Sequence, residues 1–217
     1  MKLDATKLSM IEELEMNGRA NAELVFHLGR IASGEGLAEG LTAAQWAALR
    51  YFAQANRFSQ TPSAFAAFHA TTRGTASQTI KSLETQGYLT RMRSEDDRRS
   101  VRLVLTEKAR GILANDPFES LVRAAESLPP SVQGHFASAL QRLLDQVTQE
   151  RCKPRFGVCT SCQHLESDGC SRDGQAPYAC GFMSEPLFLE ELDGVCINFI
   201  QSKPVTVKGS VTRAEQR

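Results

Sequence analysis

Cysteine is absent from the first 151 residues of this 217-residue chain, and all six cysteines come later: Cys152, Cys159, Cys162, Cys170, Cys180 and Cys196. No apolar run approaches the ~20 residues that a membrane-spanning helix needs. The N-terminal segment carries acidic side chains where a signal peptide has its apolar core. We therefore expect a cytoplasmic protein that does not enter a membrane.

Arrangements typical of an enzyme are also missing. The histidines, His27, His69, His135 and His164, are scattered along the chain. No nucleophile–base pair, phosphate-binding loop or pair of carboxylates accompanies them. We therefore expect that the protein is not an enzyme. A redox enzyme or electron carrier that uses the cysteines is the less favoured alternative.

The formal net charge is zero, but the charges are unevenly distributed. Residues 61–110 hold nine basic and five acidic side chains, whereas residues 1–40 and residues 152–203 each hold four basic and seven acidic ones. A basic middle between acidic ends indicates one surface suited to a polyanion. Chance clustering on a solvated face would give the same counts, so this interpretation depends on the fold.

Three helices are expected between residues 42 and 86. Each begins with a hydroxyl side chain that can accept a hydrogen bond from the first turn, namely Thr42, Thr61 and Thr72. The first helix is expected to bury Trp46, Leu49 and Ala53, and the third to bury Ala76, Ile80 and Leu83.

Two short strands, residues 88–93 and 101–106, are expected to follow Gly87, which stands at a left-handed helix C-cap. Pro117 is expected to kink the next helix, and Ser131 to begin the last long one. The order of helix, short helix, turn, helix and hairpin predicts a winged helix-turn-helix. The predicted fold class is therefore mostly α, with a small β component.

Residues 41–113 resemble the MarR family of transcriptional regulators. The resemblance rests on three motifs in the order and spacing of that family: LETQGYL at 83–89, DRR at 97–99 and LTE at 105–107. It implies a homodimer that binds double-stranded DNA at a palindromic operator. The effector and target genes cannot be inferred from these motifs. Gly74 departs from the family pattern and would soften the start of the recognition helix.

The resemblance also implies roles for individual residues. The residues that would lie in the major groove are Thr72, Arg73, Thr75, Ser77, Gln78 and Lys81. Asp97 would hold the wing through a bridge to Arg99, and Arg98 and Arg99 would face phosphates or the minor groove. For Ser77 and Lys81, a solvated polar position explains the residue equally well.

The last long helix has an apolar stripe that the winged core is too small to cover, made of Val132, Phe136, Leu140, Leu143 and Val147. The stripe agrees with the implied dimer. The expected organisation is dimerisation helices at 1–40, a DNA-binding core at 41–106, further dimerisation helices at 107–151, a cysteine module at 152–203 and a polar tail at 204–217.

The cysteine spacing indicates a metal site. Cys159 and Cys162 form a C-x₂-C pair, which brings two thiolates to one metal centre. Cys170, Cys180 and Cys196 follow, so five thiols are available where zinc or an iron–sulfur cluster takes four. A disulfide-bearing tail is the least favoured explanation in a cytoplasmic protein.

Three short segments together resemble the ligand pattern of high-potential iron–sulfur proteins: CTSCQHL, ACGFM and GVCINF. The resemblance implies a [4Fe–4S] cluster bound by Cys159, Cys162, Cys180 and Cys196, with Phe182 and Phe199 shielding it. Cys170 could replace one ligand, because the spacing is longer than in that family. His164 is an alternative ligand, although a surface histidine is the preferred interpretation, and Cys152 is not expected to bind. Zinc remains the alternative metal.

The combined hypothesis is a MarR-type regulator, and specifically a repressor, whose operator affinity depends on an iron–sulfur cluster that senses redox state or iron. Loss of the cluster would reorganise residues 152–203 and, through the preceding dimer helix, change the spacing of the two wings. The alternative is a ligand-responsive repressor in which a zinc module only adds stability.

Overall fold

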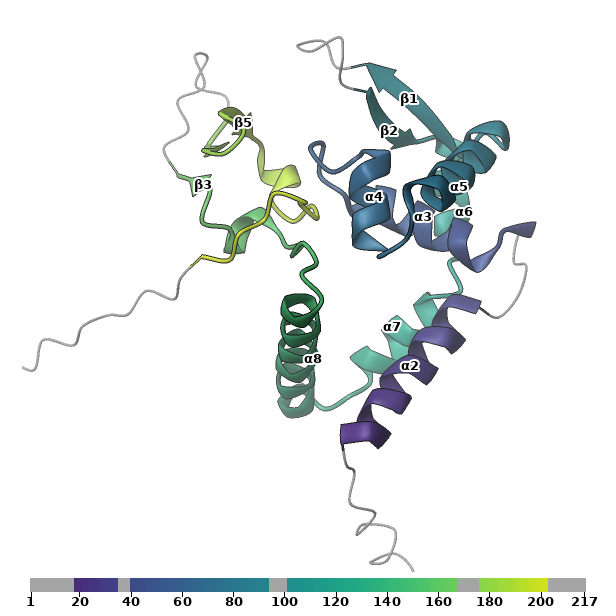
Figure 1. Cartoon of the computed structure of the whole chain (residues 1–217), viewed down its shortest axis with the longest axis vertical. Helices are drawn as coiled ribbons and strands as arrows, with labels where there is room; N and C mark the ends of the chain where they lie inside the picture. The colour runs from purple at the N-terminus through teal and green to yellow at the C-terminus, as the bar shows by residue number, and fades with distance from the viewer. Residues whose placement is uncertain (1–17, 35–39, 94–100, 168–175, 203–217) are drawn as a thin grey trace, which may run out of the picture. The chain divides into compact units, whose positions relative to one another are not determined.

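The computed structural model describes residues 18–34, 40–93, 101–167 and 176–202. Over these residues the chain is mostly helical with two small sheets, as predicted (Figure 1). None of the described helices is both long and apolar enough to cross a membrane. The chain divides into two compact units: Met1–Arg50 with Gln78–Thr90 and Leu105–Leu143, and Tyr51–Ser77 with Arg91–Val104 and Leu144–Arg217.

Helix α3 (Ala43–Gln54) begins with the predicted capping box. The backbone N–H of Gln45 donates to Thr42 Oγ1 over 3.3 Å, and that of Thr42 donates to Gln45 Oε1 over 2.8 Å. Two N–H groups that lack a partner within the helix are thereby satisfied. Trp46 and Leu49 are buried as expected. The prediction that Ala53 is buried is wrong. Ala53 lies on the same face of α3 as Trp46 but two turns later, and there this face is exposed to solvent.

Helix α5 (Arg73–Thr85) is the predicted recognition helix. Thr72 caps it, since its Oγ1 accepts from the backbone N–H of Thr75 over 3.1 Å. Its inner face is buried as predicted and consists of Ala76, Ile80 and Leu83. The opposite face is left to solvent and carries the polar residues considered below.

The wing follows α5 as a two-stranded sheet of β1 (Leu89–Arg93) and β2 (Val101–Leu105). Gly87 stands between α5 and β1 with φ +74°, a left-handed conformation that glycine adopts without strain. The hydroxyl of Thr106 donates to the carbonyl of Gly87 over 2.7 Å, which ties the end of β2 to this turn.

The long helix expected after the wing is in fact two helices, α6 (Glu107–Leu113) and α7 (Glu119–Glu126). The chain breaks at Asp116, whose carboxylate accepts from the backbone N–H of Phe118 over 2.9 Å and pairs with Arg50 over 2.9 Å. Pro117 lacks an N–H group and cannot continue a helix from the preceding turn. The prediction that Pro117 only kinks one long helix is therefore wrong. The chain leaves the helical conformation between α6 and α7, and the buried ion pair of Asp116 with Arg50 stabilises this break.

Helix α8 (Pro130–Glu150) begins one residue earlier than predicted. Its apolar stripe is largely exposed in the single chain, with Leu143 52% and Val147 46% accessible. In the first unit, helix α2 (Gly18–Gly34) contacts α7. An apolar hollow of about 560 Å³ is lined by residues of α2, α7 and α8, including Val25, Val122 and Phe136.

The second unit joins helix α4 (Pro62–Phe68) and the cysteine-bearing segment. Thr61 caps α4 by accepting from the backbone N–H of Ala64 over 3.2 Å. After α8 the chain forms an antiparallel sheet in the order β3 (Leu165–Glu166), β4 (Tyr178–Cys180), β5 (Glu185–Leu187). Two short 3₁₀ turns, η2 (Cys159–Ser161) and η3 (Leu189–Glu191), flank this sheet in the sequence.

Candidate DNA-binding surface and cysteine site

The solvent face of α5 carries the residues expected in the major groove. Thr72, Arg73, Thr75, Ser77, Gln78 and Lys81 are all exposed. Gly74 lies inside α5 and does not interrupt it, and the expected softening of the helix start stays a prediction. The wing residues Asp97, Arg98 and Arg99 lie outside the described residues, and their roles remain predictions.

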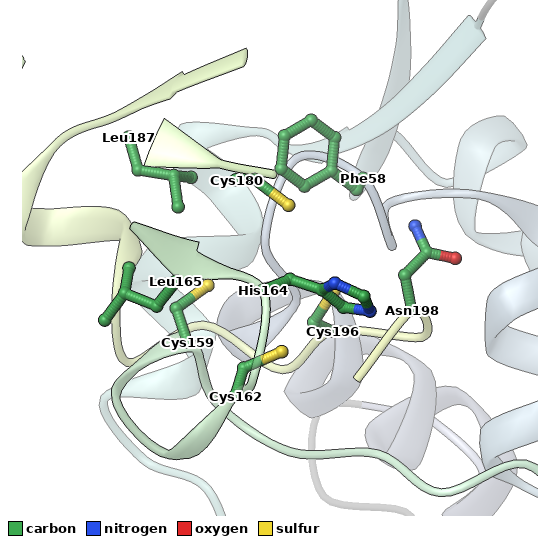
Figure 2. A pocket seen from close by; sticks show the side chains of 9 residues that line it. All are labelled: Phe58, Cys159, Cys162, His164, Leu165, Cys180, Leu187, Cys196 and Asn198. Atoms are coloured by element: carbon green, nitrogen blue, oxygen red, sulfur yellow. The ribbon is translucent and has the colours of Figure 1, made fainter. Parts of the chain in front are cut away.

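Four of the predicted ligands line one pocket (Figure 2). Cys159, Cys162, Cys180 and Cys196 surround a common space, and His164 lies in front of Cys196 in this view. All four thiols are free. Residues up to 37 positions apart in the sequence therefore line the same pocket, and their role as metal ligands stays a prediction.

The backbone around each cysteine explains how the four thiols come together. The turn η2 brings Cys159 and Cys162 close, with the N–H of Cys162 donating to the carbonyl of Cys159 over 2.9 Å. Cys180 ends β4 and pairs with Leu165 of β3. The N–H of Cys196 donates to the carbonyl of Gly157 over 2.8 Å, so Cys196 is held beside the segment that leads into η2.

The walls of this pocket are mainly apolar. Cys159, Cys180, Leu187 and Leu192 form a buried cluster against which Phe58, Leu165 and Tyr178 pack. Burial, followed by negative charge on Cys196, Cys162 and Cys180, raises the pKa of the Cys159 thiol to about 11. Four thiolates would repel one another in such surroundings. A metal centre compensates their charge, so the donor set fits a thiolate-bound metal group.

The arrangement differs from a compact single-ion site. Among the residues that the structure describes, no group of three or more Cys, His, Asp or Glu side chains is placed to hold one metal ion. The four thiols nevertheless line one common space.

Two expectations about the surroundings of the cysteines are corrected. His164 is not a simple surface residue: it lines the pocket, and its Nε2 atom is buried without a hydrogen-bond partner. Phe182 is 57% exposed and does not line the pocket itself, but its ring centroid lies 5.3 Å from that of His164. Phe199 is buried against Gly157 and is not part of the pocket wall.

The aromatic residue that does line the pocket is Phe58, which sequence reasoning missed. It precedes the first ligand by about a hundred residues and stands in the loop between α3 and α4. No spacing or motif marks it, because only the tertiary fold brings that loop to the cysteines.

The two remaining cysteines, Cys152 and Cys170, were expected to play different roles. Cys152 is exposed and does not line the pocket, in agreement with its expected lack of a ligand role. Cys170, the possible substitute ligand, lies outside the described residues, so its role stays open.

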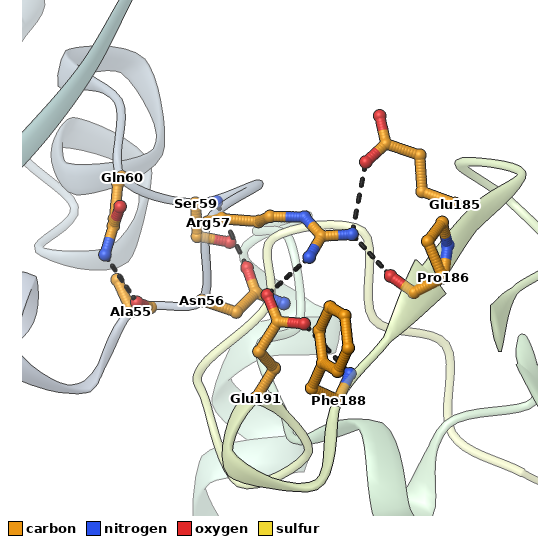
Figure 3. A network of polar contacts seen from close by, with 9 residues as sticks. All are labelled: Ala55, Asn56, Arg57, Ser59, Gln60, Glu185, Pro186, Phe188 and Glu191. Carbon is orange, nitrogen blue, oxygen red and sulfur yellow. Dashed lines mark hydrogen bonds and ion pairs between the residues drawn. The ribbon is translucent and has the colours of Figure 1, made fainter. Parts of the chain in front are cut away.

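The loop that contains Phe58 is attached to the cysteine segment by further contacts (Figure 3). Arg57 donates to Glu191 over 2.6 Å, to Glu185 over 3.1 Å and to the carbonyl of Pro186. All of these residues belong to the second unit.

Comparison with known proteins supports the assignment of the winged region. Residues 39–100 match the sequence model of the MarR family. The matched region ends before the first cysteine of the chain, Cys152. A search of curated proteins gave no match.

Solved structures resemble the chain in fold. The Staphylococcus aureus MepR–DNA complex aligns with a TM-score of 0.51 at 16% identity, covering 62% of this chain and 99% of that one. A MarR/EmrR family regulator from Acinetobacter sp. ADP1 gives a TM-score of 0.51 at 16% identity, covering 63% and 99%. The fold is therefore the winged-helix fold of MarR regulators over about three fifths of the chain.

Proposed function

We propose that the protein is a DNA-binding transcriptional repressor of the MarR type, whose operator affinity depends on a [4Fe–4S] cluster bound by Cys159, Cys162, Cys180 and Cys196. The observation that carries the proposal is the meeting of a winged-helix fold and four free thiols in one chain. The fold supplies DNA binding, and the thiols supply a site that responds to redox state or iron.

The DNA-binding part rests on the exposed face of α5. Its side chains are polar or basic from Thr72 to Lys81, with the first acidic residue at Glu84. A recognition helix of this kind presents hydrogen-bonding side chains to base edges and charges to phosphates. That one of the similar structures is a complex with DNA is in keeping with this role.

The proposed function requires that the protein acts as a homodimer. The apolar faces of α2 and α8 are open to solvent in the single chain, with Phe26 66%, Leu143 52% and Leu144 59% exposed. A second copy would cover these faces and present two recognition helices to a palindromic operator.

The cluster is preferred to zinc because the segments CTSCQHL, ACGFM and GVCINF resemble the ligand pattern of high-potential iron–sulfur proteins. When bound, such a cluster supplies reversible one-electron transfer and is lost on oxidation or iron shortage. The protein contributes the four thiolates, the apolar wall of Phe58, Leu165 and Leu187, and exclusion of water. His164 lines the same space, and its buried Nε2 atom has no hydrogen-bond partner in the protein.

Anaerobic purification tests the metal assignment. We expect brown protein with about four iron and four sulfide per chain, both absent from Cys159→Ser and retained in Cys152→Ser. Colourless protein with one zinc per chain would replace the proposal by a repressor with a structural zinc site. Protein without metal, grown and purified with iron and zinc present, would contradict both.

A further inference from the structure

The loop before α4 forms part of the cysteine pocket and, a few residues later, the start of the helix-turn-helix. Phe58 lines the pocket with the four thiols. Thr61 caps α4, whose first residue is Pro62. Only two residues, Ser59 and Gln60, separate the pocket wall from this cap.

Three residues in and before this loop are hydrogen-bonded to the cysteine segment. The N–H of Asn56 donates to the carbonyl of Val195 over 3.0 Å, and the N–H of Val195 donates to the carbonyl of Gln54 over 2.7 Å. Ser59 is fully buried, and its hydroxyl oxygen accepts from the N–H of Ile197 over 2.8 Å. Val195 and Ile197 flank the ligand Cys196, so a movement of Cys196 is transmitted to both ends of the loop.

Arg57 adds a charged connection to a different part of the cysteine segment. Its guanidinium bridges Glu191 of η3 and Glu185 of β5, and the latter is the pairing partner of the ligand Cys180 (Figure 3). Arg57 is 20% exposed, and so is Glu191, so the pair is partly shielded from water. A planar guanidinium that joins two carboxylates holds the loop in one orientation.

The same loop also reaches the wing. The carbonyl of Gln60 accepts from the N–H of Leu103 in β2 over 2.8 Å. Within the second unit, then, one short segment contacts the cysteine pocket, begins α4 and holds a strand of the wing.

From these contacts we infer that the metal state of the cysteine site reaches the DNA-binding helices through residues 54–60, with Arg57 as the positioning residue that couples them. The inference rests on the proposed function and specifies its route, which differs from the dimer helix expected from the sequence. Loss of the metal frees Cys180 and Cys196, loosens the residues bonded to Arg57 and to Ser59, and releases the start of α4.

The test uses the full-length chain with and without its cluster. Binding is measured by fluorescence anisotropy on a labelled duplex that the wild-type protein has selected, in either metal state, from random sequences. We expect the two states of the wild type to differ at least about 5-fold in Kd. In Arg57→Gln the iron is retained and the two Kd values agree within about 2-fold.

Matched variants separate coupling from general damage. The double variant Glu185→Gln with Glu191→Gln removes the charges that face Arg57 and should behave as Arg57→Gln does. Arg155→Gln removes an exposed, 3.9 Å ion pair with Asp145 in the same unit and should keep the wild-type difference. Hydrogen exchange gives a second readout: the amides of Asn56 and Ser59 should exchange at least ten times faster without the cluster, and equally fast in both states of Arg57→Gln.

The outcomes are distinguishable. If the wild type binds DNA equally in both states, the proposed function fails. If the wild type responds and Arg57→Gln responds as strongly, the function stands and the coupling through Arg57 is wrong. Loss of iron from both Arg57→Gln and the double glutamine variant would also overturn the inference, because these residues would then support the metal site itself.

Discussion

The winged region and the cysteine segment are built around different kinds of core. In the winged region, Trp46, Leu49, Ile80 and Leu83 are almost fully buried, and capped helices surround them. In the cysteine segment the buried cluster consists of two thiols and two leucines, beside strands of two or three residues. The first core is closed by apolar surface, whereas the second contains free thiols at the site where we propose that a cluster binds.

Because of this difference, we expect the two regions to respond differently to loss of the metal. A segment with so few buried aliphatic side chains cannot offset the loss of chain entropy without a staple. The winged region has a sufficient core of its own. Metal loss should therefore affect one region strongly and leave the helices of the other formed.

The largest effect should come from replacing the thiols. Cys159→Ser, Cys162→Ser, Cys180→Ser and Cys196→Ser should each lose all iron, and residues 152–202 should become sensitive to protease while the winged region stays folded. Iron analysis and limited proteolysis with mass spectrometry measure this. Cys152→Ser is the control and should keep its iron. A variant among the four with full iron content would remove that cysteine from the ligand set, and Cys170→Ser then identifies its substitute.

The next effect concerns assembly. Leu140 lines the apolar hollow of the first unit, so Leu140→Asp would place an unpaired charge in the proposed dimer interface, which is strongly unfavourable. We expect at least a 100-fold weaker dimer by sedimentation analysis, with iron content unchanged. Ser138→Asp, on the opposite side of α8, should remain dimeric. A wild-type protein that is a folded monomer at micromolar concentration would contradict the dimer.

A pair of glycine variants compares the two regions directly. An added Cβ at Gly194 would lie 2.9 Å from Cβ of Asn56, too close for van der Waals contact. Gly194→Ala should therefore lower the free energy of unfolding by about 1–3 kcal/mol. Gly134 in α8 has free space around it, so Gly134→Ala should raise that free energy by about 0.5–1 kcal/mol. Urea unfolding of the cluster-loaded protein measures both, and equal effects would argue against the tight attachment of the loop.

The remaining predictions concern DNA binding by the solvent face of α5. Gln78→Ala should weaken binding to the selected duplex by about 1–3 kcal/mol and relax the base preference at one position. Lys81→Ala should weaken binding to all duplexes alike and reduce the salt dependence by about one ion. Titrations at several salt concentrations distinguish the two. If neither variant changes binding, α5 is not the recognition helix.

Much of the fold could be predicted because local signals agree with one another. Thr42, Thr61 and Thr72 each cap a helix in the structure as the sequence predicts. Gly87 adopts the left-handed conformation expected of a C-cap. These features depend on residues only a few positions apart, so a single sequence is enough to identify them.

The sequence-based predictions were wrong or incomplete where contacts between residues far apart in the sequence determine the structure. The break between α6 and α7 depends on the ion pair of Asp116 with Arg50, a partner far away in the sequence. The pocket wall includes Phe58 for the same reason, and nothing near Phe58 distinguishes it from an ordinary loop residue. The four cysteines expected to act together do line one pocket, but whether they bind a metal as the resemblance implies stays a prediction.

The central claim is that one chain couples DNA binding to the state of the cysteine site. The most direct test measures the Kd of a single preparation for its selected duplex with the cluster bound, after its removal by oxidation and chelation, and after anaerobic reconstitution. We predict a change of at least about 5-fold that reconstitution reverses, and a Kd for Cys159→Ser that stays at the cluster-free value. The same Kd in all three states, at one salt concentration, would contradict the claim.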